Sequence, residues 1–142
     1  MRGRRYQDGM SKLAQGSFDV TATREPPYDS ADGLVLARTS FVKTFKGDLE
    51  ASSTVQMLSA GGPTKGSAVY VALERVQGKL GERSGNFVLA HYGVMNRGQA
   101  TLQLAVAPDS GTGALCGLSG QMTIEIKEGG QHFYRFEYDL LE

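Results

Sequence analysis

The stretch VALERVQGKLGERSGNFVLAHYGV, residues 71–94, alternates apolar and polar residues on both sides of a central turn signal. Alternation with a period of two is typical of a β-strand that has one buried face. The segment LGERSG divides the stretch, so we expect two antiparallel strands joined by a short loop. We place the tip of this loop at Glu82 and Arg83, which makes Gly81 face Ser84.

The same alternation continues on both sides of this hairpin, and Gly or Pro clusters interrupt it at short intervals. No window of the chain has a convincing helical period. The pattern predicts eight strands, at residues 16–23, 34–45, 49–59, 67–80, 85–92, 99–107, 121–127 and 132–140. Pro26 and Pro27 exclude the intervening loop from the interior of a sheet.

Short loops of this kind join antiparallel neighbours. Successive antiparallel strands can close into a barrel, which removes the exposed edges of the sheet. We therefore predict an all-β fold, a single eight-stranded antiparallel up-and-down β-barrel whose interior holds side chains or one small ligand. A sandwich of two sheets is the alternative. Residues 14–142 are assigned to the barrel domain and residues 1–13 to a flexible N-terminal arm.

The last two predicted strands determine their own register. The apolar face of the final strand consists of Tyr134, Phe136, Tyr138 and Leu140. A three-residue loop, residues 128–130, pairs Ile124 with Tyr134 and Met122 with Phe136, which keeps all these side chains inside. A two-residue loop would turn the isoleucine outward, because a slip of one residue reverses every side chain.

One face of the hairpin at residues 71–94 carries Glu74 and His91 among apolar residues, with Tyr70 on the same face. The predicted register places Glu74 opposite His91 in the interior. Neither group is buried at low cost alone, whereas a carboxylate paired with an imidazole fixes the tautomer of that ring. Such a pair is typical of acid–base sites, although it also occurs as a satisfied structural pair. We predict a ligand-binding site made of Glu74, His91, Tyr70, Tyr134 and Tyr138, and assign no catalytic residue.

The glycine-rich stretch PDSGTGALCGLSGQM, residues 108–122, does not match the known phosphate-binding loops. Cys116 stands where the dinucleotide motif needs glycine, and no lysine follows the last glycine. We interpret the stretch as a corner of the barrel in which Leu115 and Leu118 point inward as a plug.

Cys116 is expected to be a small core or half-buried residue, and His132 a solvated surface residue. Two histidines and one cysteine at wide spacing predict no metal site, and no cofactor is predicted.

The whole chain has 142 residues and a formal net charge of zero, which gives no reason to expect nucleic acid or an anionic membrane as a partner. No apolar run approaches the roughly 20 residues of a transmembrane helix. A single cysteine suits a reducing compartment, so we expect a cytoplasmic protein.

The outer face of residues 67–92 is partly apolar, at Val69, Val71, Leu73, Val88, Ala90 and Tyr92. An apolar face of this kind predicts a homo-oligomer.

Three blocks of the sequence resemble the bacterial family called domain of unknown function 3224. They are FVKTFKGDLEAS, residues 41–52, the hairpin at residues 71–94 and the glycine-rich stretch at residues 108–122. That family in turn resembles the barrels of allene oxide cyclases and plant dirigent proteins. The resemblance implies an eight-stranded barrel, frequently oligomeric, with an interior of ligand size. It implies no activity, because no functional side chain of those barrels can be placed on this sequence.

These observations favour a protein that binds a small, largely apolar ligand inside the barrel. One alternative is an isomerase- or cyclase-type enzyme that moves a proton with Glu74 and His91. Another is a barrel filled by side chains that acts only through protein–protein contacts. Empty space beside Glu74 would favour the first two hypotheses over the third.

Overall fold

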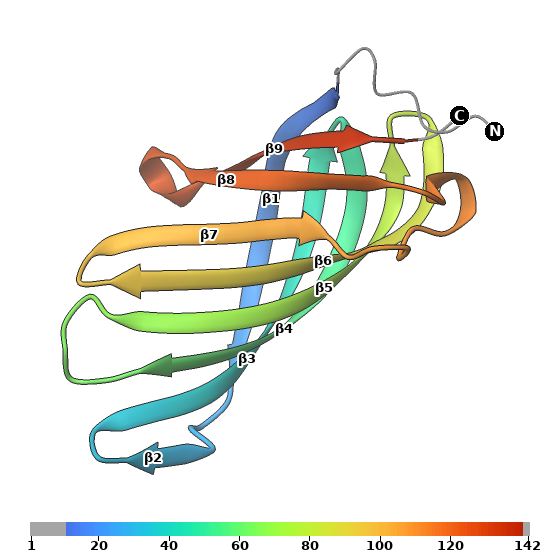
Figure 1. The fold of residues 1–142 in the computed structure, drawn as a ribbon. Helices are drawn as coiled ribbons and strands as arrows, with labels where there is room; N and C mark the ends of the chain where they lie inside the picture. Colours follow the sequence, from blue (N-terminus) through green and yellow to red (C-terminus); the bar gives the residue numbers. More distant parts are fainter. Residues whose placement is uncertain (1–10, 141–142) are drawn as a thin grey trace.

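The computed structural model describes residues 11–140, which form one antiparallel sheet that closes on itself (Figure 1). The strands are β1 (Lys12–Arg24), β2 (Asp29–Ala31), β3 (Leu34–Gly47), β4 (Leu49–Gly61), β5 (Ala68–Leu80), β6 (Arg83–Asn96), β7 (Gln99–Val106), β8 (Ser119–Ile126) and β9 (His132–Asp139). Two single 3-10 turns, η1 (Gly113–Leu115) and η2 (Glu128–Gly130), are the only helical segments within residues 11–140. Neither is long and apolar enough to cross a membrane.

β1 closes the barrel because it pairs with a strand on each side. Residues 12–18 pair with β9, and residues 16–24 pair with β3. The ring β1-β9-β8-β7-β6-β5-β4-β3 thus contains eight antiparallel strands, which confirms the predicted up-and-down barrel and excludes the two-sheet sandwich. β1 begins at Lys12, earlier than the sequence pattern indicates. Most of the predicted N-terminal arm, residues 1–10, lies outside the described residues.

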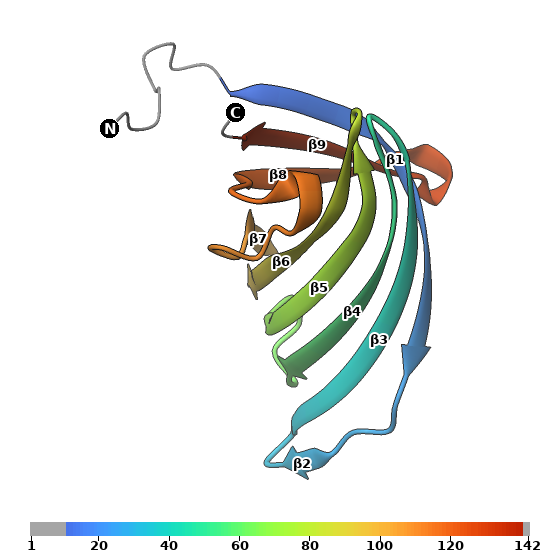
Figure 2. The same cartoon turned by 90° about the vertical axis from the view of Figure 1, so that its right-hand side faces the viewer.

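β2 is a short additional strand that the sequence analysis missed. It pairs with β3 at the far end of the sheet, through a turn at Asp32 and Gly33 (Figure 2). Both residues have a positive φ, of 55° and 82°, as the Asp-Gly turn of a tight hairpin requires. Pro26 and Pro27 stay outside the sheet as expected, and β2 only prolongs its edge.

The loop between β5 and β6 differs from the prediction. Leu80 pairs with Arg83, so the two loop residues are Gly81 and Glu82 rather than Glu82 and Arg83. Gly81 has a φ of 63°, a conformation that glycine adopts without a steric penalty at the first loop position. The turn therefore forms where the backbone of Gly81 permits it.

As a consequence, Glu74 pairs with Leu89, and His91 pairs with Ala72. The register differs from the predicted one by two residues. An even shift keeps every side chain on its predicted face, so Glu74 and His91 still point inward as diagonal neighbours. The predicted interior face of the hairpin is thus confirmed although the predicted opposite pairs are wrong.

The register of β8 and β9 agrees with the prediction. Ile124 pairs with Tyr134, and Met122 pairs with Phe136. Lys127 N–H donates to the Gln131 carbonyl at 2.8 Å, which leaves the predicted three-residue loop 128–130 between them. The aromatic face of β9 consequently points into the barrel.

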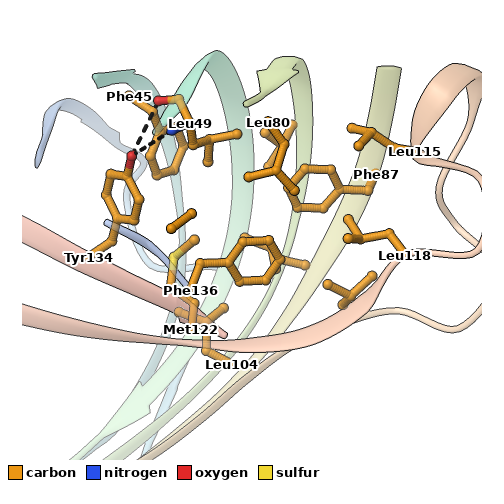
Figure 3. Packing of buried hydrophobic residues seen from close by; sticks show 14 of the residues in the cluster. Phe45, Leu49, Leu80, Phe87, Leu104, Leu115, Leu118, Met122, Tyr134 and Phe136 are labelled. Atoms are coloured by element: carbon orange, nitrogen blue, oxygen red, sulfur yellow. Dashed lines mark hydrogen bonds between the residues drawn. The ribbon is translucent and has the colours of Figure 1, made fainter. Parts of the chain in front are cut away.

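Side chains fill one half of the barrel interior (Figure 3). The buried apolar cluster consists of Ala14, Phe18, Phe45, Leu49, Val76, Leu80, Phe87, Leu89, Leu104, Val106, Leu115, Leu118, Met122, Tyr134, Phe136 and Leu140. The Tyr134 hydroxyl donates to the Lys46 carbonyl and accepts from Leu49 N–H, both at 2.9 Å. This contact joins β9 to the turn between β3 and β4 and satisfies the only polar atom of a fully buried ring.

The glycine-rich stretch forms the corner that the sequence predicts. Leu115 and Leu118 are 1% and 3% exposed and complete the filled half of the interior. A side chain at Gly111 would overlap the backbone of Leu115, so the close approach of the chain to itself requires glycine there. Cys116, by contrast, is exposed, which contradicts its expected burial. A 3-10 turn repeats every three residues, so the side chains at positions 115 and 118 lie on the same side and that of Cys116 points away from it.

β7 and β8 are joined far more weakly than the other neighbours in the ring. Only one pair, Ala105 and Gln121, connects them, and the two strands diverge beyond it (Figure 1). The chain between them follows the edge of β6 instead: Ala107 N–H donates to the Val88 carbonyl, and Thr112 N–H donates to the Asn86 carbonyl. The wall of the barrel therefore has a seam between β7 and β8.

The outer surface of the barrel is apolar on one side and polar on the other. Outward-facing Leu58, Val71 and Tyr92 lie opposite one another across β4, β5 and β6, and each is at least 45% exposed. Leu73, at 62%, is the next outward residue of β5. The outer face of β8, β9 and β1 carries exposed polar residues instead, at Gln121, Thr123, Glu125, Arg135, Glu137, Gln15 and Asp19. Self-association through the apolar side stays a prediction.

We expect Leu73→Asp to shift the protein toward monomer, because a carboxylate on the apolar side would be desolvated in a contact between two copies. Thr123→Asp, on the polar outer face of β8, is the matched control and should leave the mass unchanged. Size-exclusion chromatography with light scattering measures both. A wild-type protein that is monomeric at high concentration would contradict the prediction.

Candidate functional site

The other half of the barrel interior is hollow. A cavity of about 340 Å³ lies there, and its lining residues are Phe18, Val20, Phe41, Lys43, Val55, Met57, Tyr70, Ala72, His91, Leu102, Ile124, Ile126 and His132. Most of these side chains are apolar, and the polar ones are Lys43, Tyr70, His91 and His132. Ligand sites commonly combine an apolar lining with a few polar groups in this way. The barrel is therefore not filled throughout by side chains.

A buried polar cluster borders the cavity, with Glu74 at its centre. The Glu74 side chain of β5 is fully buried, and both of its oxygens accept hydrogen bonds. Lys43 Nζ, from β3, lies 3.2 Å from Oε1, and His91 Nε2, from β6, lies 2.8 Å from the same oxygen. Ser53 Oγ, from β4, donates to Oε2 at 2.6 Å. Four neighbouring strands thus meet at one carboxylate.

The partners of Glu74 keep it ionised. Burial acts to raise the pKa of this carboxyl group, but the hydrogen bond to His91, the charge of Lys43 and the hydrogen bond from Ser53 outweigh burial. The pKa is therefore lowered from its ordinary value. An ionised carboxylate only accepts hydrogen bonds, so His91 Nε2 is the donor to Glu74. The carboxylate consequently fixes the tautomer of His91.

Lys43 is held in place by aromatic rings as well as by Glu74. Its ammonium lies 4.7 Å from the centre of the Phe18 ring and 5.8 Å from that of Phe45. The face of an aromatic ring attracts a cation, and the attraction is larger where water is excluded. These contacts explain how a lysine that is only 7% exposed remains inside the barrel.

Tyr70 completes the polar end of the cavity. Its ring packs over Gly93, the residue directly opposite on β6. Burial raises the pKa of the Tyr70 hydroxyl, and the negative charge of Glu74 raises it further. The phenol therefore stays protonated at neutral pH and offers an O–H donor beside the cavity.

The structure brings three of the predicted site residues together, namely Glu74, His91 and Tyr70. The other two lie in the packed half of the barrel and do not line the cavity. Tyr134 is 1% exposed and bonded to backbone, whereas Tyr138 stacks on Phe136 with the ring centres 5.3 Å apart. We therefore omit Tyr134 and Tyr138 from the proposed site.

The sequence analysis missed Lys43, Ser53 and His132. Lys43 stands between Phe41 and Phe45 at the spacing of a single strand face, which is the signal that could have placed it inside. His132 was expected on the surface, but it continues the inward face of β9 and packs against Phe18, with the ring centres 5.0 Å apart. His132 directly follows a turn, and for this reason the sequence analysis assigned its side chain to the surface.

His91 has one ring nitrogen left for a ligand. Nε2 is taken by Glu74, and Nδ1 has no hydrogen-bond partner within residues 11–140. No buried side-chain nitrogen or oxygen of these residues lacks a partner, so Nδ1 must reach accessible space, and His91 lines the cavity. In the neutral ring Nδ1 is a hydrogen-bond acceptor and a base, and in the protonated ring it is a donor.

The described residues offer no cluster of three or more His, Cys, Asp or Glu side chains that could hold a metal ion.

Residues 14–138 match the model of a family described as protein of unknown function (DUF3224). The chain belongs to the DUF3224 family. A crystal structure of a DUF3224 protein of unknown function from Shewanella oneidensis MR-1 is 47% identical in sequence and superimposes with a TM-score of 0.87. The match covers 93% of this chain and 99% of the other. No similar protein is found among the curated proteins.

In this DUF3224 protein, Glu74→Gln is expected to lower the free energy of unfolding at neutral pH by about 3 kcal/mol, because it leaves the Lys43 ammonium buried without its counter-charge. Lys43→Met combined with Glu74→Gln should recover part of this loss, since neither charge then remains. Urea denaturation measures both. Glu125→Gln, at an exposed position on β8, is the control and should change little.

Glu74→Gln should also alter the dependence of the free energy of unfolding on pH. Because the folded-state pKa of Glu74 is lowered, its stabilising contribution is fully present above the unfolded-state value, near 4.5, and is lost as pH falls through the folded-state value. The stability gap between wild type and Glu74→Gln should therefore narrow below about pH 4.5. A gap that stays constant down to pH 3 would contradict this assignment.

Proposed function

We propose that this protein binds a small, largely apolar ligand in the hollow half of the barrel. The observation that carries the proposal is the coincidence of an apolar cavity of about 340 Å³ with a buried polar cluster at one end of it. The volume lies at the lower end of the range for small-molecule sites. Apolar walls supply affinity by removing the ligand from water, and a few polar groups orient it.

Burial of the charged groups of this cluster carries a desolvation penalty. Replacing both members of a buried charge pair by apolar side chains is often neutral or stabilising, so net stability alone does not account for the presence of this pair. Here Lys43 and His91 are held beside empty space rather than enclosed in the packed half of the interior. Their placement supports a role toward a ligand.

The seam between β7 and β8 supports a route into the cavity. Three lining residues, Leu102, Ile124 and Ile126, belong to these two strands, and they lie beyond the single pair that joins the strands. Leu102 is 41% exposed and Ile126 is 64% exposed. An apolar molecule can therefore contact apolar side chains all the way from the surface to the interior.

To test the proposal, the protein is purified from its own host for native mass spectrometry and is titrated with decanol by calorimetry. We expect a retained small molecule and saturable binding of decanol. Ala72→Leu places extra carbon atoms in the cavity and should weaken decanol binding about tenfold or more. Ala105→Leu, at an exposed position on β7, is the matched control. Equal affinities of the two variants and wild type would overturn the proposal.

A second function is favoured by one specific observation, the open Nδ1 of His91. A neutral imidazole that is oriented by a carboxylate can remove a proton from a bound molecule, while Tyr70 and Lys43 donate hydrogen bonds to a developing negative charge. An isomerase of this kind needs no other co-reactant, since the proton returns to another atom of the same molecule.

The two functions separate in one experiment on the molecule retained from the host. If the protein is an enzyme, His91→Gln should abolish conversion of that molecule while its binding remains measurable, because the amide keeps a similar size without acting as a base. Nuclear magnetic resonance in deuterated water detects conversion through exchange of a carbon-bound proton. Tight binding with no exchange in the wild type would exclude the enzyme.

A further inference from the structure

The wall of the cavity has a charge asymmetry. Its inner end presents the ammonium of Lys43, the imidazole of His91 and the hydroxyl of Tyr70. The carboxylate that neutralises them lies behind, because Glu74 is fully buried and does not line the cavity. No aspartate or glutamate within residues 11–140 is part of the lining. A bound molecule thus meets the hydrogen-bond donors of Lys43 and Tyr70 and the Nδ1 atom of His91, which accepts in the neutral ring and donates in the protonated ring, but no anionic side chain.

The donors at this end are only partly used. An ammonium group has three N–H donors, and Glu74 is the single hydrogen-bond partner of Lys43 within the described residues. The Tyr70 hydroxyl has no hydrogen-bond partner there either. Both groups lie at the cavity wall, where a ligand replaces the water that would otherwise satisfy them. Lys43 and Tyr70 are therefore placed to donate hydrogen bonds to a ligand.

We propose that the ligand is an amphipathic anion, an apolar body with a single carboxylate that lies against Lys43 and His91. This inference rests on the proposed function, and it adds the chemical class of the ligand. Charge-assisted hydrogen bonds between an ammonium and a carboxylate are stronger than those to a neutral hydroxyl. The apolar body extends toward the seam, along Leu102, Ile124 and Ile126.

The net charge of the site predicts a second observable property of ligand binding, a coupled uptake of protons. The charges of Lys43 and Glu74 cancel, so a ligand carboxylate brings one negative charge that needs a partner in a cavity lined mostly by apolar side chains. His91 lines the cavity, its Nδ1 has no hydrogen-bond partner within residues 11–140, and the ring supplies the positive partner when it takes up a proton on binding. The charged or titratable groups around the imidazole are Glu74 and Tyr70 from β5, Lys43 from β3 and His132 from β9. At a pH at which the imidazole of the unliganded protein is neutral, binding of the carboxylate should therefore be accompanied by uptake of a proton.

Decanoate, decanol and decylamine share one apolar chain and differ in the head group, which makes them suitable for the test. Calorimetry on the full chain should show decanoate binding about tenfold or more tighter than decanol, and decylamine weakest of the three. Repeating the decanoate titration in buffers of different ionisation enthalpy should reveal the proton uptake. Decanol binding as tightly as decanoate would overturn this inference and leave the proposed function intact. Failure of all three to bind would overturn both.

Variants test the assigned residues. Lys43→Met should remove the preference for decanoate over decanol while decanol binding is retained. Since that variant leaves Glu74 without its main counter-charge, the double variant Lys43→Met/Glu74→Gln, which is free of both charges, provides the same measurement. Lys46→Met is the control, because Lys46 is exposed on the outer face of β3 and pairs with Asp19. An unchanged preference in both Lys43 variants would overturn the assignment of Lys43.

Discussion

The organisation of this barrel depends on one buried carboxylate. An ionised group inside a protein must be paired and hydrogen-bonded, and Glu74 is satisfied by Lys43, Ser53 and His91 from three other strands. These contacts fix the side-chain directions of β3, β4, β5 and β6 at the same level of the barrel. On the side of the β3–β4 and β5–β6 turns the interior is filled by aromatic and aliphatic side chains, and on the opposite side it is hollow. The polar cluster is thus the floor of the cavity.

The filled half supplies the rigidity on which this arrangement relies. Tyr134 bonds the backbone of the turn between β3 and β4, and β1 pairs with both β9 and β3, so the ring is closed by two independent means. Phe136 stacks on Phe87 across the interior, with the ring centres 5.8 Å apart. Because this half is densely packed, the weak join between β7 and β8 does not open the barrel. The fold therefore tolerates the weak pairing between β7 and β8.

The barrel and the inward faces of its strands could be predicted from the sequence, since alternation of apolar and polar residues reports directly on which side of a strand is buried. The pair of Glu74 and His91 survived an error of two residues in the loop because side-chain direction depends only on whether the shift is even. The spacing assigns Lys43 to the strand face of Phe41 and Phe45, but pattern alone could not establish that Lys43 or His132 is inside, since a charged or polar residue on an apolar face indicates an exposed position until its partner is known. The burial of Lys43 depends on Glu74, 31 residues away in the chain, and on two aromatic rings. Tyr134 and Tyr138 were correctly directed inward, but alternation does not tell how far along the barrel the packed half extends.

The polarity of the cavity follows from where the carboxylate is attached. Glu74 lies on the strand between β4 and β6, so its oxygens are reached from both sides by Ser53 and His91 and from one strand further by Lys43. These partners surround the negative charge, and the groups that remain in contact with the cavity are the cation, the imidazole and the phenol. Had the carboxylate faced the cavity, the same four side chains would have favoured a cationic ligand. The order of the strands, rather than the composition of the cluster, therefore determines which charged groups border the cavity.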